Sequence, residues 1–248
     1  MVFDVNAQSH VGLVRKGNED MILVDSLMIR DESYTIRFEQ KHDERSIYAI
    51  ADGMGGHNAG EIASEETLKD LLLFFRNLPS GLTLYEFIMA FKRWIIHIKD
   101  HINGMGEENL VCQGMGTTLV GICCYETRFY WFNCGDSRLY RFRNGELLQL
   151  SEDHSYERLT GLKGYSNVIT NCIGANCSDV FLDIHELTDI QPEDRFILCS
   201  DGLTDMVEDS QIERFLRVGS TSGQLVKLAI REGGRDNVSV CMVKVSDF

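Results

Sequence analysis

Residues 117–150 read TTLVGICCYETRFYWFNCGDSRLYRFRNGELLQL. The segment contains four apolar runs separated by pairs of polar or small residues, at 117–125, 128–134, 137–143 and 146–150. The last separating pair, Asn144-Gly145, is typical of a two-residue hairpin turn. Strands with such short connections pair antiparallel, because a parallel pair needs a long crossover. The segment therefore predicts a meander in a mostly antiparallel sheet.

Apolar runs typical of strands also lie on both sides of the meander, at 3–9, 21–25, 47–51, 179–186, 195–200 and 238–246. The irregular segment 151–175 follows the meander and is expected to form an exposed excursion resembling a flap.

Two amphipathic helices are predicted before the meander. Asn58 is the expected N-cap of the first, with Glu61 as its capping-box partner, and its apolar face consists of Ile62, Leu68, Leu71, Leu72 and Phe75. The second spans about 83–103, with an apolar stripe of Leu84, Phe87, Ile88, Phe91, Trp94, Ile95, Ile98 and Ile102. Two more helices are expected near 203–218 and 221–232. Because each pair needs a sheet face to cover, the pattern predicts two sheets with helices outside them.

The composition predicts one globular domain over residues 1–248, since neither Pro79 nor Pro192 marks a linker. The formal charge of −14 disfavours nucleic-acid binding, which needs Lys/Arg surfaces. No apolar stretch is long enough to span a bilayer and Met1–Asn6 has no basic region, so neither membrane insertion nor secretion is expected.

The eight cysteines do not have the paired spacing of a zinc site. Cys123 and Cys124 are adjacent, and most of the others are scattered within strand-like runs. We expect free, buried thiols and no disulfides, as in a cytoplasmic protein.

Acidic residues stand beside glycine or at the ends of apolar runs in several segments. Asp52 ends the run 47–51, and Asp201 ends the run 196–200. Carboxylates that converge at the edge of a core repel one another unless a cation lies between them. Glycine beside an acid lets the backbone approach the same cation. The pattern predicts a site for a hard metal ion with oxygen ligands.

A dinucleotide-binding loop is the alternative for residues 52–57, which lie between a predicted strand and a helix. The glycine spacing does not fit G-x-G-x-x-G, because Asn58 stands where that motif needs glycine. No Gly-Lys-Ser/Thr phosphate loop occurs in the chain. A nucleotide-binding role is therefore disfavoured.

Six segments carry a family resemblance: GLVRKGNED (12–20), ADGMGGH (51–57), GMGTT (114–118), NCGDSR (133–138), SDGLTD (200–205) and GRDNVS (234–239). In this order the chain resembles a type 2C metal-dependent protein phosphatase of the bacterial kind. The fold that the resemblance implies is α+β, a four-layer α/β/β/α sandwich of two mostly antiparallel sheets flanked by helix pairs. This fold agrees with the strand and helix pattern.

The resemblance implies that Asp52, Asp201 and Asp236 hold two Mn²⁺ or Mg²⁺ ions. Asp52 would bridge the ions, and the Gly53 carbonyl would add a backbone ligand. Such oxygen ligands suit both metals. The implied reaction is hydrolysis of phosphoserine and phosphothreonine on proteins by a hydroxide that bridges the two metal ions.

Four further residues match family positions. Glu19 and Asp20 match an acidic pair that supports the metals through water, and Asp136 matches a ligand of a third, weaker metal. Arg15 matches the arginine that binds the phosphoryl group, for which a planar guanidinium is suited. The implied partners are phosphorylated proteins and a cognate Ser/Thr kinase, and we expect a monomer.

The chain also departs from the family pattern. Met54 replaces a histidine that is proposed to donate a proton in eukaryotic relatives, and a thioether cannot donate one. His57 is expected to cap or pack against the helix, and His154 to have a structural role. The segment between Asp153 and Asn167 is shorter than the usual flap.

Two other functions are compatible with the family. A non-catalytic scaffold typically loses a metal aspartate, but Asp52, Asp201 and Asp236 are all present. A regulatory phosphatase dedicated to one phosphoprotein commonly lacks the segment Arg15–Asp20, which this chain retains.

Overall fold

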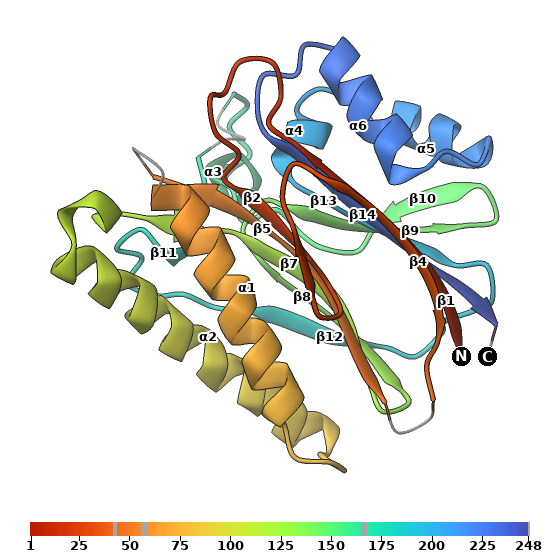
Figure 1. Ribbon diagram of the computed structural model, residues 1–248, viewed down its shortest axis with the longest axis horizontal. Helices are drawn as coiled ribbons and strands as arrows, with labels where there is room; N and C mark the ends of the chain where they lie inside the picture. Colours follow the sequence, from red (N-terminus) through yellow and green to blue (C-terminus); the bar gives the residue numbers. More distant parts are fainter. Residues whose placement is uncertain (42–43, 56–58, 165–167, 248) are drawn as a thin grey trace.

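The computed structural model describes residues 1–41, 44–55, 59–164 and 168–247. Two sheets pack face to face, and helices cover the outer face of each (Figure 1). The arrangement is the predicted four-layer α/β/β/α sandwich.

The first sheet has the strand order β10-β9-β13-β14-β1-β4 within the described residues, and its neighbours pair antiparallel. Its strands are β1 (Val2–His10), β4 (Ser33–Glu39), β9 (Arg138–Arg143), β10 (Glu146–Gln149), β13 (Arg195–Cys199) and β14 (Val238–Asp247). Pairing of β1 with β14 places Val2 opposite Asp247, so the first and last described residues lie close together (Figure 1).

The second sheet has the order β11-β6-β5-β7-β8-β12, with β2 also paired to β5 and β3 to β2. Its strands are β2 (Asp20–Val24), β3 (Leu27–Ile29), β5 (Arg45–Met54), β6 (Gly116–Thr117), β7 (Leu119–Tyr125), β8 (Arg128–Cys134), β11 (Ile173–Gly174) and β12 (Asp183–Leu187). The meander is thus split between the two sheets, since β7 and β8 lie in one and β9 and β10 in the other. Asn144 and Gly145 have φ of 53° and 85°, as the predicted hairpin turn requires.

The helices form two groups. Helices α1 (Ala59–Asn77) and α2 (Leu84–Glu108) cover the second sheet, followed by a 3₁₀ turn, η1 (Leu110–Cys112). Helices α4 (Asp201–Thr204), α5 (Asp209–Arg217) and α6 (Ser222–Arg231) lie on the first sheet, and α3 (Tyr156–Thr160) lies in the flap segment. Thr83 and Glu86 form a capping box at the start of α2. The expected N-cap Asn58 lies outside the described residues.

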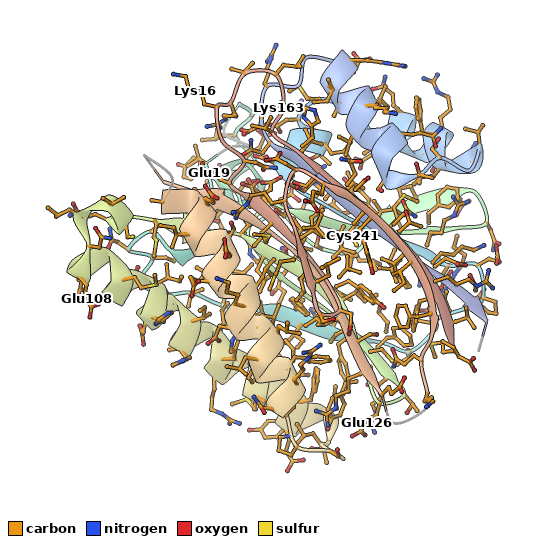
Figure 2. The ribbon with its side chains drawn as sticks, in the orientation of Figure 1. Lys16, Glu19, Glu108, Glu126, Lys163 and Cys241 are labelled. Atoms are coloured by element: carbon orange, nitrogen blue, oxygen red, sulfur yellow. The ribbon has the colours of Figure 1, made fainter. Side chains whose placement is uncertain are left out.

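The buried apolar side chains form three layers. Phe3, Tyr48 and Phe196 belong to the layer between the two sheets. Phe87 of α2 stacks on Tyr130 of β8, with ring centroids 4.0 Å apart, in the layer beneath α1 and α2. A third layer joins the first sheet to α5 and α6. Side chains fill the interior around Cys241, while Glu19 and Glu126 lie toward opposite ends of the molecule (Figure 2).

Three sequence predictions need correction. The helix expected at 203–218 is two helices, because the chain turns after Thr204 and Glu208 begins a new capping box with Gln211. The segment 151–175 is not exposed throughout, since Ser151, His154, Ser155 and residues 171–174 are buried. The strands β3, β4 and β11 were not predicted.

The expectation of free thiols is confirmed. All eight cysteines are unpaired, and seven of them are buried.

Candidate active site

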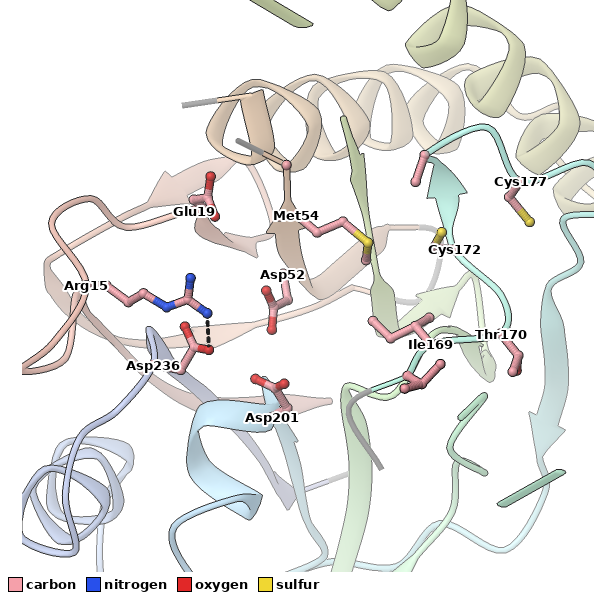
Figure 3. A pocket seen from close by; sticks show the side chains of 14 residues that line it. Arg15, Glu19, Asp52, Met54, Ile169, Thr170, Cys172, Cys177, Asp201 and Asp236 are labelled. Atoms are coloured by element: carbon pink, nitrogen blue, oxygen red, sulfur yellow. Dashed lines mark hydrogen bonds and ion pairs between the residues drawn. The ribbon is translucent and has the colours of Figure 1, made fainter. Parts of the chain in front are cut away.

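A cleft of about 710 Å³ opens at one end of the sandwich and is lined by residues from five separate segments. Its lining comprises Arg15, Glu19, Asp52, Gly53, Met54, Gly55, Val168, Ile169, Thr170, Cys172, Ala175, Cys177, Asp201 and Asp236. Figure 3 shows Asp52 and Asp201 between Arg15 and Asp236 on one side and Ile169 and Cys172 on the other. The structure therefore brings together residues from both ends of the chain.

The strand register brings the first two acids together. Asp20 and Asp52 are directly paired across β2 and β5. The backbone N–H of Asp52 donates to the Thr118 hydroxyl, 3.1 Å away, and its carbonyl accepts from the Thr117 hydroxyl at 2.9 Å. These bonds fix the end of β5 where its backbone reaches the cleft.

Two glycines allow the segments around the cleft to pack closely. A Cβ at Gly53 would lie 2.1 Å from the Gly60 carbonyl oxygen, and one at Gly202 would lie 1.9 Å from the Asn237 carbonyl oxygen. Real Cβ atoms do not approach backbone oxygens so closely. Glycine is therefore required beside Asp52 and Asp201 by space, as well as by any approach of a ligand.

Asn237 links the loop that carries Arg15 to the start of β14. Its side-chain amide donates to the carbonyls of Val11 and Gly17, at 2.9 and 3.0 Å, and its carbonyl oxygen accepts from the Glu19 N–H at 2.8 Å. The sequence predictions did not include Asn237. Its position next to Asp236 within the segment 234–239 was the available signal.

Ser200 was also missed, although it precedes Asp201. Its hydroxyl donates to Oδ2 of Asp20 at 2.8 Å and accepts from the Ser239 N–H at 3.0 Å. This bond holds Asp20, which is completely buried.

The carboxylates of the cleft disturb one another's protonation. Burial and then repulsion by Asp20, Asp201, Asp136 and Asp236 raise the pKa of Asp52 well above its ordinary value. Asp201 is affected in the same direction, first by burial and then by Asp136 and other neighbouring acids. Negative charge at this end of the molecule is therefore insufficiently compensated by the protein itself.

Two further acids show the same effect. Burial raises the pKa of Asp20 to about 6 and that of Asp136 to about 7. One oxygen of each carboxyl, Oδ1, is buried without a hydrogen-bond partner. Asp136 does not line the cleft, but it contributes to the raised pKa values of Asp52 and Asp201.

Arg15 lies against Asp236, with Nη2 2.6 Å from Oδ2 (Figure 3). Its loop is held to the Asp236 loop by the Leu13 N–H, which donates to the Gly234 carbonyl at 2.7 Å. Both side chains are partly exposed, 52% and 34% respectively. Arg15 is thus available to a ligand that enters the cleft.

The donor chemistry of the cleft fits a hard cation. Its acids offer only oxygen atoms. Outside the lining, the unpartnered Oδ1 atoms of Asp20 and Asp136 would be compensated by positive charge or by water. Among the described residues, no group of three or more His, Cys, Asp or Glu side chains already surrounds a common metal position. Ion binding would therefore require side-chain adjustment, including that of Asp236 away from Arg15.

The two remaining residues of interest have different placements. Met54 lines the cleft. His154 lies behind the cleft, where Nδ1 accepts from the Gly135 N–H at 3.0 Å and Nε2 lies 3.0 Å from Oδ2 of Asp183. These bonds give His154 a structural environment. His57 lies outside the described residues.

An α+β sandwich with a cluster of acids and one arginine at the end of its strands defines a class of metal-dependent hydrolases. Residues 26–227 match the model of the protein phosphatase 2C family. The chain belongs to that family.

Curated relatives include the serine/threonine protein phosphatase PstP of Mycobacterium tuberculosis, which is 31% identical over the whole of this chain. The chain spans about half of PstP, 46% of its length. The serine/threonine phosphatase stp of Listeria monocytogenes is 33% identical, over 84% of this chain and 87% of stp.

Solved structures agree with these matches. The S. agalactiae serine/threonine phosphatase has a TM-score of 0.83 at 28% identity and covers 98% of this chain and 100% of its own. The catalytic domain of PstP in complex with two manganese ions has a TM-score of 0.74 at 30% identity, with 100% coverage of both chains. Within the described residues, no helix has the length and apolarity needed to cross a bilayer.

Proposed function

We propose that this chain hydrolyses phosphoserine and phosphothreonine on proteins in a reaction that depends on Mn²⁺ or Mg²⁺. The observation that carries the proposal is the gathering of Asp52, Asp201 and Asp236 in one cleft beside Arg15. The manganese bound by the PstP domain and the names of the curated relatives support it.

In this proposal Asp52, Asp201 and Asp236 hold two ions, with the Gly53 carbonyl as a further ligand. Glu19 and Asp20 support them from the adjoining loop and strand, and a weaker third ion would lie between Asp136 and Asp201. When bound, a pair of divalent ions lowers the pKa of water and offsets charge on the phosphoryl oxygens, so that no protein nucleophile is needed.

Arg15 binds and orients the phosphoryl group. Its guanidinium can donate to two oxygens of the substrate once it separates from Asp236. The same side chain would then compensate negative charge that develops on the transferred group. Met54 has no proton to donate to the leaving alkoxide, so a group other than Met54 must protonate it.

The test is hydrolysis of p-nitrophenyl phosphate and of a phosphoserine peptide by the purified chain. We expect activity that requires manganese, disappears with chelator and falls to near background in Asp201→Asn. Asp189→Asn is the matched control, because Asp189 pairs with Arg141 and Arg143 on the surface of the first sheet, outside the cleft lining. Activity that persists in excess chelator would reject the metal-dependent reaction. No activity with any divalent metal would favour a non-catalytic scaffold.

We further propose that the chain acts as a cytoplasmic monomer in signal transduction, opposing a protein kinase. A comparison of phosphoproteins with and without the gene would identify the substrate. Sites whose phosphorylation rises in the absence of the gene are the expected result.

A further inference from the structure

Two cysteines, Cys172 and Cys177, line the wall of the cleft across from Arg15 and Asp236 (Figure 3). They stand apart from the other thiols, since neither belongs to the apolar core layers. Cys172 is 8% exposed and Cys177 is partly exposed. The proposed phosphatase reaction uses neither of them.

The backbone between these cysteines reverses direction. Cys177 N–H donates to the Gly174 carbonyl at 2.8 Å, and the two intervening residues, Ala175 and Asn176, have φ of 48° and 58°. Such a turn brings Cys177 back beside Gly174. The Cys172 Sγ lies 4.0 Å from the same Gly174 carbonyl oxygen, so both cysteines are gathered around Gly174.

A clamp next to the turn limits how far the two cysteines can separate. The buried Asn171 side chain donates to the Phe181 carbonyl at 2.9 Å and accepts from the Phe181 N–H at 3.2 Å. The cysteines therefore lie in a short loop whose ends are tied together. The two thiols are close enough for Cys177 to help raise the pKa of Cys172 to about 12, an effect caused first by burial.

We propose that Cys172 and Cys177 form a site of reversible oxidation, at which hydrogen peroxide converts the two thiols into an intrachain disulfide at the cleft wall. The more exposed Cys177 sulfur attacks the peroxide, the O–O bond breaks, and a sulfenic acid and water are formed. The Cys172 sulfur then displaces the sulfenic oxygen as a second water. Both thiol protons end in water, the two sulfurs lose two electrons, and the peroxide gains them.

The position of the loop connects this reaction to the cleft. Gly174 of β11 is paired with Gly116 of β6, which is paired with Met54 at the end of β5. The contact is tight, since a Cβ at Gly116 would lie 2.8 Å from that of Ala175. Diagonal neighbours across a hairpin are about 7–8 Å apart, and cysteines whose Cα atoms are more than about 7 Å apart can be bridged only if the backbone moves. Closing the bond therefore pulls on the turn, and we expect the strain to reach Met54 and Val168–Thr170.

Mass spectrometry can test the bond directly. Trypsin is expected to release residues 164–195 as one peptide, which contains both cysteines and no other, whereas Cys134 lies in the separate peptide 129–138. The folded protein is treated with hydrogen peroxide, its free thiols are alkylated, and it is digested. We expect peptide 164–195 to become two hydrogens lighter and to take up no alkylating reagent, with full reversal by dithiothreitol.

The number of free thiols titrated in denaturant should accordingly fall by two from the eight in the sequence. The Cys177→Ser variant should keep all of its remaining thiols under the same treatment, whereas Cys112→Ser, which removes a buried thiol outside the cleft lining, should still lose two. A peptide 164–195 that stays reduced while other cysteines oxidise would overturn the proposal. So would a bond between peptides 129–138 and 164–195, because it would make Cys134 the partner.

The effect of the disulfide on catalysis rests on the proposed function and is measured in a separate activity assay. Oxidation should lower kcat/KM several-fold in the wild-type chain, and dithiothreitol should restore it. The kcat/KM of Cys177→Ser should be the same before and after oxidation. Bond formation with no change in activity would remove the link to the cleft. A chain inactive before oxidation would contradict the proposed function, and the peptide masses would still decide the disulfide.

Discussion

At the scale of single residues, the contact between Arg15 and Asp236 is the most informative. The sequence assigns one to a phosphoryl group and the other to a metal ion, yet the structure pairs them at 2.6 Å. This ion pair occupies the two groups that the proposed reaction needs for other partners. We infer that binding of metal and phosphate separates the pair and gives each side chain its own partner.

The Arg15→Ala variant tests this division of roles. A charge-assisted hydrogen bond contributes about 1.5–3 kcal/mol, so kcat/KM should fall roughly 10- to 100-fold. The manganese concentration for half-maximal activity should change little, since Asp236 keeps its carboxylate. Arg37→Ala, on β4, is the control because Arg37 pairs with Asp4 and lies outside the cleft lining. An equal loss of metal affinity and substrate use would mean that Arg15 supports the metal site instead.

At the scale of elements, α2 shows how one helix combines a sequence signal with tertiary packing. Phe87 is completely buried and stacks on Tyr130, whereas Leu84, one turn earlier, is 39% exposed. The periodicity of the sequence placed both on the same stripe. Leu84 is the first residue of α2, and its side chain stays partly exposed there.

This difference predicts unequal effects of truncation. Phe87→Ala should lower the free energy of unfolding by about 3–5 kcal/mol, the usual effect of removing a buried aromatic ring. Leu84→Ala should change it by less than about 1 kcal/mol, as a partly exposed side chain does. Urea denaturation of both variants measures the two values. Similar losses would show that Leu84 is buried in solution.

The sequence revealed some elements better than others. The strands at 47–51 and 195–200 were visible because they are continuous apolar runs that end in Asp52 and Asp201. Strand β4 was hidden because it lies at a sheet edge and alternates exposed with partly buried residues. The break between α4 and α5 was also hidden, since Met206 and Val207 continue the apolar pattern through the turn.

The acids of the site could be predicted from the sequence, but the contacts that position them could not. The acids stand in short segments beside glycine or asparagine, so each could be found locally. The pairing of Asp20 with Asp52 depends on strand register, and the bonds of Asn237 to Val11 and Gly17 join residues over 200 positions apart. Contacts between residues so far apart in the sequence depend on the whole fold and leave no local sequence pattern.

At the scale of the whole molecule, the cluster of buried acids makes stability depend on pH when chelator is present. The pKa of Asp136 is about 7 and that of Asp20 about 6 in the folded protein, both above the ordinary value of 3.8. Between pH 3.8 and these raised pKa values, the two carboxyl groups hold more protons in the folded state than in the unfolded state. Stability therefore falls as pH rises through this range and recovers as pH falls.

We expect the melting temperature in chelator to decrease from pH 5 to pH 8. The decrease should be smaller in Asp136→Asn, which removes one of the raised carboxyl groups. Added manganese should raise the melting temperature at pH 8, because an ion compensates the ionised acids. Scanning calorimetry across this range measures all three. A melting temperature in chelator that stays level or rises with pH would contradict the raised pKa values.

The antiparallel pairing of β1 with β14 has a consequence for how this unit can be joined to others. Each strand has its cleft-side end next to a functional loop, at His10 and Val238, so its other end lies about 25–30 Å away. Both chain ends emerge together on that remote side. A tether attached to either terminus would leave the catalytic mouth uncovered, and a short peptide could join the two ends for circular permutation without crossing the substrate's path.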